Sequence, residues 1–483
     1  MRYLLLYIPF FISLLFWGAH ELTYWTAWAG SWYILLLVFG GLIKRPPERK
    51  PWAQQLLRPL YLPHAIFAVY VALSSVFYFL HAKGYFYFTK TGDGREAEHI
   101  ELIAYAQQLY LLGHAALVHG LLVASRYKQP KFHLTFKSYS GGALALALGA
   151  SGMVILLKLI PGLGQFAVKF DALSLVASII AVALVLPERK WGYSLLAVAL
   201  FGFNLYQSAL TGFKEAVLVP LIILGALLYP QYKRLVLLTA PAALVVLLFV
   251  LPFVTQYIRD ESWSGGKEAG QAATEALENL QETSTDELVS GNWGFFTYRF
   301  SEISLFTKYL GNVPENRPFY AFQLIEQALT GLVPSALYPG KPFMESVVMD
   351  RVLENGIIEW YSLDKVSAKP QIVVDGYLSF GEFGVWIFCF VIGLLSATAS
   401  VLAERLFGGY LWGTALVYTG LFQIFWRGNC IEFMANTVFW SFVTMALLFL
   451  ISRALGLVKK NPPPSTLRTP HSTLNTHPSP SST

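Results

Sequence analysis

Five cationic side chains stand beside strongly apolar stretches of the sequence. They are Lys214 in TGFKEAVLVP, Arg299 and Arg317 in or just after an aromatic-rich stretch, Lys341 in LVPSALYPGKP, and Arg427 in FQIFWRGN. A cation near a low-dielectric boundary is costly without an anionic partner. That partner can be an Asp or Glu of the chain, or a bound anion such as a lipid-linked diphosphate. A structural ion pair is the simpler interpretation of any single residue, whereas the five together favour anion binding.

The Gly-rich stretch DGYLSFGEFG adds two carboxylates, Asp375 and Glu382, just before a long apolar run. A carboxylate at such a boundary can act as a general base if a substrate hydroxyl lies within hydrogen-bond reach. Two other interpretations remain open. The glycines can form only a turn into a tightly packed helix, and Asp375 can form an ion pair with Lys369 or Arg427. A turn alone does not require two acids, which favours a functional role.

The sequence lacks several motifs that would identify other chemistry. HExxH, GxSxG, the P-loop pattern GxxxxGK[ST] and Asp-x-Asp are all absent. Without Asp-x-Asp, we do not expect a metal-dependent glycosyltransferase that uses a sugar nucleotide. Without a P-loop, we do not expect an ATP-driven pump. We therefore expect neither a metal nor a cofactor.

These residues belong to a chain with the composition of an integral membrane protein. Of its 483 residues, 55% are hydrophobic and 13% are charged, whereas soluble proteins carry about 25% charged residues. A helix needs about 20 apolar residues to cross the hydrocarbon core, and the sequence predicts about twelve such spans in an all-α fold. We expect them at 3–19, 24–43, 64–81, 100–125, 140–160, 170–186, 192–210, 216–229, 235–258, 384–402, 411–426 and 437–455.

Basic residues gather in alternate loops of this pattern. With the N-terminus inside, the densest groups all fall on one face, as the positive-inside rule requires. They are Lys44, Arg45, Arg49, Lys50 and Arg58, then Arg126, Lys128, Lys131 and Lys137, then Arg189 and Lys190, then Lys233 and Arg234, and finally Arg405, Lys459 and Lys460. We expect both termini to be cytoplasmic. The same distribution explains the net charge of +6 without a nucleic-acid partner.

The pattern divides the chain into four parts. Residues 1–258 and 376–460 form the helix bundle, residues 259–375 form one large loop outside the cytoplasm, and residues 461–483 form a disordered tail rich in Pro, Ser and Thr. The loop begins with a polar stretch that we expect to be an exposed helix or a flexible arm. An amphipathic helix follows, with the apolar stripe Phe296, Phe300, Ile303, Phe306 and Leu310, on the membrane surface or against the bundle.

Four of these motifs carry a resemblance to a known family. LTGFKEAVLVPLIILGALL resembles the small-Gly-x-basic start of a helix in bacterial oligosaccharide repeat unit polymerases, the O-antigen polymerase (Wzy-type) family. LVPSALYPGKP resembles that family's Ile-Pro-Arg segment with a later Lys-Pro, and DGYLSFGEFG resembles its Glu-x-Tyr-x-Asn-Phe-Gly-x-x-Gly motif. FWRGN resembles its basic residue near the outer end of a late helix. These similarities span residues 211–429 in the family's order, but Ser335, Asp375 and Ser379 replace the family's Arg, Glu and Asn.

The resemblance implies a function at the outer face of the bacterial cytoplasmic membrane. There the chain would polymerise oligosaccharide repeat units linked to polyprenyl diphosphate, in a membrane that also holds a possible flippase and chain-length regulator. Asp375, Glu382 and Arg299 would be catalytic. The substrate would be bound by Lys214, Arg317, Lys341, Arg427 and Tyr377. The alternatives are an O-antigen ligase-like transferase, whose loop usually carries a His that is absent here, and a flippase or transporter, whose charges would lie at mid-membrane.

Overall fold

The computed structural model describes residues 2–43, 52–92, 97–160, 164–264, 266–334, 337–362 and 368–462. Most of them are helical, and the strands form two short antiparallel pairs, β1–β2 and β3–β4. The α-helices are α1 (Ile8–Leu14), α2 (His20–Phe39), α3 (Leu62–Phe67), α4 (Ser75–Ala82), α5 (Ala97–Ala124), α6 (Tyr139–Lys158), α7 (Gly164–Glu188), α8 (Trp191–Ala209), α9 (Lys214–Val245), α10 (Leu251–Arg259), α11 (Ala269–Glu282), α12 (Thr285–Phe295), α13 (Ile303–Leu310), α14 (Gln323–Leu332), α15 (Met344–Glu354), α16 (Ile372–Leu406), α17 (Thr419–Leu421), α18 (Ile424–Arg427) and α19 (Ile431–Ala454). The 3-10 and π segments are η1 (Arg2–Tyr7), η2 (Trp52–Gln55), η3 (Ala68–Leu73), η4 (Val246–Val250), η5 (Asp260–Ser264), η6 (Phe296–Phe300), η7 (Trp360–Ser362) and η8 (Tyr410–Tyr418), and the strands are β1 (Tyr85–Phe86), β2 (Thr89–Lys90), β3 (Phe132–Leu134) and β4 (Val458–Lys460).

The described structure is mostly helical, in agreement with the predicted all-α fold, and several of its helices have the length and composition of membrane spans. Within the described residues, seven helical segments are long and apolar enough to cross a membrane. They are His20–Phe39, Leu62–Ala82, Tyr139–Lys158, Phe166–Glu188, Glu215–Ser262, Ile372–Leu406 and Ile431–Ala454. The predicted spans 100–125 and 192–210 are also helical, as α5 and α8. The predicted span 411–426 is not one helix, because η8 is followed there by the short helices α17 and α18.

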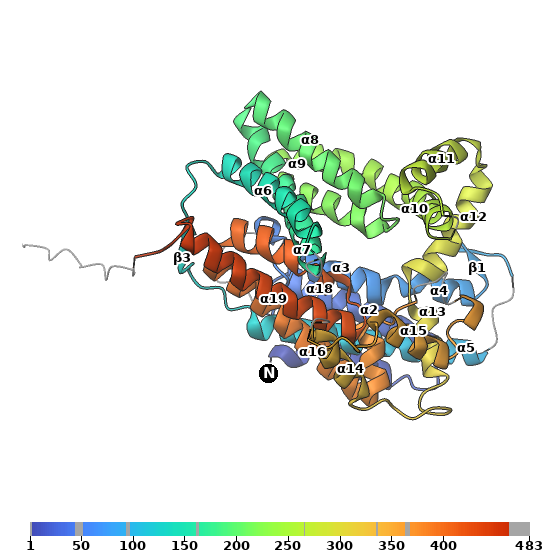
Figure 1. The fold of residues 1–483 in the computed structure, drawn as a ribbon. Coiled ribbons are helices and arrows are strands. Elements are labelled where there is room, and N and C mark those ends of the chain that lie inside the picture. The colour runs from blue at the N-terminus through green and yellow to red at the C-terminus, as the bar shows by residue number, and fades with distance from the viewer. Residues whose placement is uncertain are drawn as a thin grey trace, which may run out of the picture.

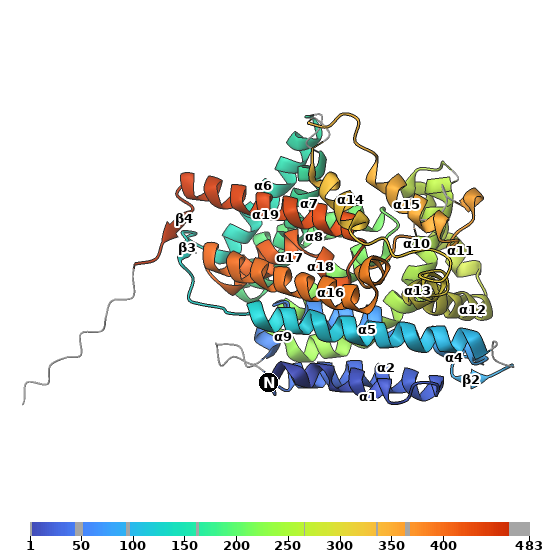
Figure 2. The ribbon, with the colours of Figure 1, turned by 90° about the horizontal axis from the view of Figure 1, so that it is seen from below.

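Glycine lets the two central helices of the bundle approach closely. α5 and α16 lie side by side over much of their length (Figure 2). A Cβ atom at Gly120 would lie 2.1 Å from the Phe390 carbonyl oxygen, and one at Gly393 would lie 2.1 Å from the Leu117 oxygen. Small residues allow this backbone contact between membrane helices, so any larger side chain at these positions would push α5 and α16 apart.

The apolar segment from α9 to α10 turns back on itself. Tyr232 has non-helical backbone angles (φ −119°, ψ 40°) between Pro230 and Pro241. The side chain of Arg259 then hydrogen-bonds to the carbonyl oxygen of Gly212, 47 residues earlier in the chain. The start of α9 and the end of α10 therefore lie side by side as the two ends of a helical hairpin, as the separate spans predicted at 216–229 and 235–258 require.

The DGYLSFGEFG stretch forms a sharp turn inside α16. Helical geometry is interrupted at Phe380 and Gly381, and Gly381 has a φ of +61°, a left-handed conformation that favours glycine. The chain doubles back so closely that a Cβ at Gly384 would lie 1.9 Å from the Gly376 carbonyl oxygen. The glycines of this stretch are therefore explained by packing alone.

The two ends of the bundle carry different segments (Figures 1 and 2). At one end β3 pairs with β4, so that the loop after α5 meets the chain after α19. At the other end lie β1, β2 and α11 to α13, and the Tyr87 hydroxyl donates a hydrogen bond to the Val289 carbonyl oxygen at 2.9 Å. Loops predicted to share one face thus lie together. Arg58 differs from the prediction of a loop residue, because it is buried and paired with Glu404 at 2.8 Å.

The predicted amphipathic stripe is buried against the bundle. Ile303, Phe306 and Leu310 are nearly or fully buried, and α13 packs on α4 and α5. The prediction of one continuous helix was wrong, because Ser301 has extended backbone angles (φ −100°, ψ 121°) that separate η6 from α13. The polar stretch before it forms α11, with Ala272 buried. The break at Ser301 matters for the site described next.

Candidate functional site

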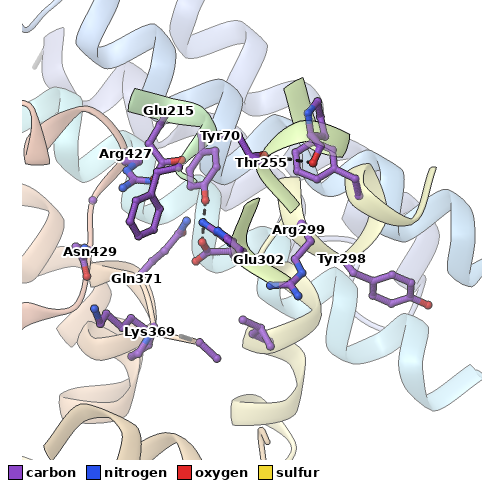
Figure 3. Close-up of a pocket in the computed structure, with 18 of the residues that line it drawn as sticks. Tyr70, Glu215, Thr255, Tyr298, Arg299, Glu302, Lys369, Gln371, Arg427 and Asn429 are labelled. Carbon is purple, nitrogen blue, oxygen red and sulfur yellow. Dashed lines mark hydrogen bonds and ion pairs between the residues drawn. The ribbon is translucent and has the colours of Figure 1, made fainter. Parts of the chain in front are cut away.

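A cavity of about 340 Å³ lies where the ends of the α9–α10 hairpin meet η6, α13 and the chain after α18. It is lined by Tyr70, Phe213, Glu215, Pro252, Thr255, Gln256, Arg259, Phe295, Tyr298, Arg299, Glu302, Leu305, Ile358, Ala368, Lys369, Pro370, Gln371, Arg427, Gly428 and Asn429. Four of these residues are cations and two are carboxylates, an excess of two formal positive charges. Figure 3 shows Arg299, Lys369 and Arg427 around the same space, each from a different segment.

Arg427 is fixed at the cavity wall by a carboxylate. Its Nη1 lies 2.6 Å from Oε1 of Glu215, in the first turn of α9. Burial by itself would lower the pKa of Arg427, but Glu215, with Tyr70 and Glu302, raises that pKa above its ordinary value. Arg427 therefore stays charged at every physiological pH.

The other cations are held differently. Arg259 donates through Nε to the Gly212 carbonyl oxygen at 3.0 Å, and Lys369 lies 2.7 Å from Glu345. Arg299 makes no hydrogen bond or ion pair with any residue that the structure describes, and its guanidinium faces the cavity (Figure 3). Among the described cations of the cavity, Arg299 is the one whose charge has no protein partner.

Local backbone features place these side chains. Gly428 has a φ of +80° and ends α18 directly after Arg427, and Gly212 has a φ of +72° before the start of α9. Both are left-handed conformations that glycine adopts without strain. Arg299 belongs to the π segment η6, and Tyr70 to the π segment η3. Single π turns within helices are frequent at functional sites.

Tyr70 and Gln371 add uncharged polar groups to the cavity wall. The Tyr70 hydroxyl donates a hydrogen bond to Oε1 of Glu302 at 2.8 Å. Gln371 lies between Arg427 and Glu302 in Figure 3 and is only 4% exposed. Neither its amide nitrogen nor its amide oxygen has a hydrogen-bond partner in the described part of the chain. An unpaired buried polar group lowers folding stability by about 1–3 kcal/mol, so the unpaired amide of Gln371 requires an explanation.

The structure brings only part of the predicted cation set together. Arg299 and Arg427 line the cavity. Lys214 begins α9 between two lining residues, but its side chain lies outside the described structure. Arg317 and Lys341 do not line it. Arg317 pairs with Glu354 at 3.1 Å. Lys341 donates to the carbonyl oxygens of Gly331, in the last turn of α14, and Val333, directly after it, at 2.7 and 2.9 Å.

Asp375 does not reach the cavity. Its side chain is completely buried and lies 3.2 Å from Arg351. Its Oδ2 accepts a hydrogen bond from the Ile431 backbone N–H at 2.6 Å, at the start of α19. Arg351 also contacts Glu432 at 2.5 Å. The ion pair weighed for Asp375 therefore exists, but its partner is Arg351 and not Lys369 or Arg427.

The other two predicted residues lie outside the cavity as well. Glu382 is exposed and accepts a hydrogen bond from the Tyr105 hydroxyl at 3.1 Å. Tyr377 is 4% exposed and donates to the Val313 carbonyl oxygen at 3.1 Å. Neither residue lines the cavity.

Sequence reasoning missed several lining residues. Tyr70 lies inside an apolar span and Glu302 on the polar side of the amphipathic stretch, positions that carry no signal of their own. Lys369 was considered only as a partner of Asp375. Arg259 and Gln371 lie near the two ends of the predicted loop, residues 259–375. Their position at the two ends of one loop is the signal that could have identified them. No three His, Cys, Asp or Glu side chains in the described ranges converge as metal ligands would.

Residues 8–460 match the family model described as Domain of unknown function (DUF8712). No curated protein matches the chain, and no solved structure matches it.

Proposed function

We propose that this chain, which belongs to the DUF8712 family, transfers glycan from a donor linked to a polyprenyl diphosphate. The reaction we propose is polymerisation of oligosaccharide repeat units of an O-antigen or exopolysaccharide at the outer face of the bacterial cytoplasmic membrane. The observation that carries this proposal is the cationic cavity, in which Arg299 has no partner among the described residues. A cavity of about 340 Å³ suits a head group and one or two sugar-sized groups, because small-molecule pockets span about 300–1,000 Å³.

The cations suit a diphosphate leaving group. As the glycosyl bond to the diphosphate breaks, negative charge grows on the phosphate oxygens, and fixed positive charge stabilises it. Arg299 and Arg427 present planar guanidinium groups that can bind phosphate oxygens through two parallel N–H bonds. Arg259 and Lys369 add two further positive charges to the lining. Glu215 and Gly212 hold Arg427 and Arg259 in place before the donor binds.

The proposed topology has twelve spans with both termini in the cytoplasm. It places residues 259–375 outside, so that Arg299 and Lys369 come from the outer segment and Arg427 from the end of a late span. The grouping of β3 with β4 at one end of the bundle, and of β1 and β2 with α11 to α13 at the other, supports it. The cavity then faces the side on which lipid-linked repeats are joined.

Binding of undecaprenyl diphosphate to the purified full-length protein tests the donor site. Loss of a charge-assisted hydrogen bond costs about 1.5–3 kcal/mol, so we expect Arg299→Ala to weaken binding by roughly ten- to a hundredfold. Arg299→Lys should lose less. Arg317→Ala is the matched control, because Arg317 lies outside the cavity and pairs with Glu354. Equal binding by wild type and Arg299→Ala would refute the assignment of the cavity to the diphosphate.

A gene deletion tests the reaction. Cells without the protein should accumulate single lipid-linked repeats and lose long-chain polymer, and the wild-type gene should restore the ladder of chain lengths. Normal ladders with loss of attachment to the final carrier would instead show a ligase-like transfer. Repeats retained on the inner leaflet would instead show a transporter.

A further inference from the structure

We infer that Glu302 and Gln371 form the acceptor side of the cavity, where a sugar hydroxyl binds and gives its proton to Glu302. This inference rests on the proposed function, which accounts for the cations but leaves these two side chains unused. The neutral side of the cavity then recognises a hydroxyl-bearing glycan, and Glu302 is the group that accepts the proton.

Gln371 indicates the class of ligand. Its amide is buried, lines the cavity, and presents one unpaired donor group and one unpaired acceptor. A phosphate oxygen can satisfy the donor but not the acceptor, since it has no proton to give. A sugar hydroxyl donates and accepts, so one hydroxyl, or two neighbouring ones, can satisfy both ends of the amide.

Glu302 is positioned to receive the proton. The break at Ser301 turns its side chain towards the cavity, and the Tyr70 hydroxyl fixes one carboxylate oxygen at 2.8 Å. A carboxylate has about four acceptor sites on two oxygens, so a bond from Tyr70 is compatible with one from a substrate hydroxyl. Gln371 lies beside it in Figure 3, which places an oriented hydroxyl within reach of Glu302.

The other carboxylates are less suited to this role. Glu215 is the second acid of the cavity, and it is committed to Arg427 at 2.6 Å. Asp375 is completely buried with Arg351, and Glu382 lies outside the cavity. Glu302 lines the cavity, and the Tyr70 hydroxyl orients its carboxylate.

The step balances without a further reactant. The acceptor oxygen attacks the anomeric carbon of the donor sugar, and a new carbon–oxygen bond forms. The bond between that carbon and the diphosphate oxygen breaks, and its electron pair leaves with the polyprenyl diphosphate. The hydroxyl proton passes to Oε2 or Oε1 of Glu302. Arg299 and Arg427 receive the charge of the departing diphosphate.

Two measurements on the purified full-length protein test the inference. The first is binding of undecaprenyl diphosphate, and the second is the rate of polymerisation of lipid-linked repeats extracted from the deletion strain. Glu302→Gln keeps an acceptor for the Tyr70 hydroxyl but cannot take up a proton. We expect it to bind undecaprenyl diphosphate at least as well as wild type and to lose a hundredfold or more in rate. Glu302→Asp should recover part of that rate.

Gln371→Ala tests the binding half of the inference. It removes hydrogen bonds to the acceptor but no charge, so we expect a three- to tenfold rise in the half-saturating concentration of repeats, with the maximal rate retained. Glu326→Gln and Gln323→Ala are matched controls, since both residues are exposed on α14 and line no part of the cavity.

The outcomes separate the two proposals. Wild-type rates in Glu302→Gln, with diphosphate binding still dependent on Arg299, would overturn the acceptor site and leave the donor site standing. An unchanged half-saturating concentration in Gln371→Ala would overturn the role of Gln371. Absence of undecaprenyl diphosphate binding in wild type would overturn the proposed function and this inference with it.

Discussion

Replacement of Arg351 tests whether one buried ion cluster holds the outer segment to the helix bundle. Arg351 on α15 joins Asp375 on α16 and Glu432 on α19, and the three side chains are between 0 and 3% exposed. Burial opposes the charge on Arg351, whereas Asp375 and Glu432 raise its pKa above the ordinary value. Arg351→Met would leave two buried carboxylates without a cation. Such a loss typically costs about 3–5 kcal/mol, a large share of the roughly 5–15 kcal/mol that stabilise most proteins.

Thermal unfolding of the purified protein in detergent, together with its level in membranes, measures the effect. We expect Arg351→Met to lower the midpoint by several degrees and the membrane level severalfold. The matched control is Arg317→Met, whose ion pair with Glu354 is exposed and is worth at most about 1 kcal/mol. A triple variant that adds Asp375→Asn and Glu432→Gln removes all three charges and should recover most of the loss. A wild-type midpoint for Arg351→Met would refute the reasoning.

Four further predictions follow from the sequence and the packing. Asp375→Asn keeps an acceptor for the Ile431 N–H, so it should lower stability only slightly. The polymerisation rate per folded molecule should not change, and loss of that rate at normal protein level would show that Asp375 acts as a base. Gly120→Leu should abolish folding, because its Cβ would lie 2.1 Å from a backbone oxygen of α16. The Cβ of the control Gly149→Ala would meet open space, so the amount of this variant in membranes should equal that of wild type. Reporter fusions at Lys131 and Glu278 should land on opposite sides, with Lys131 cytoplasmic; one shared compartment would break the topology. Removal of residues 463–483 should leave chain length unchanged in gels, but the deletion must spare Asn461, which donates to the Lys131 carbonyl oxygen.

Asp375 is a residue whose type was evident from the sequence but whose partner was decided by the fold. DGYLSFGEFG was compatible with a functional base or a tight turn, and its two acids favoured the functional role. The structure shows the turn, with Gly376 against Gly384, and buries Asp375 with Arg351. An ion pair depends on which side chain arrives from elsewhere in the chain. Glu432 is 81 residues from Arg351, and no local pattern encodes that distance.

The sequence by itself determined the helical fold, most of the helix positions and the apolar stripe from Phe296 to Leu310. These properties follow from the transfer of local apolar surface out of water, which is a sum over neighbouring residues. Only the tertiary structure decided which charges share a cavity. Tyr70 and Glu302 are 232 residues apart, and Arg427 meets Glu215 only because the α9–α10 hairpin and α18 end at the same place. Charges interact strongly over a few ångströms and weakly beyond that, so their partners are set by the fold and not by the neighbouring sequence.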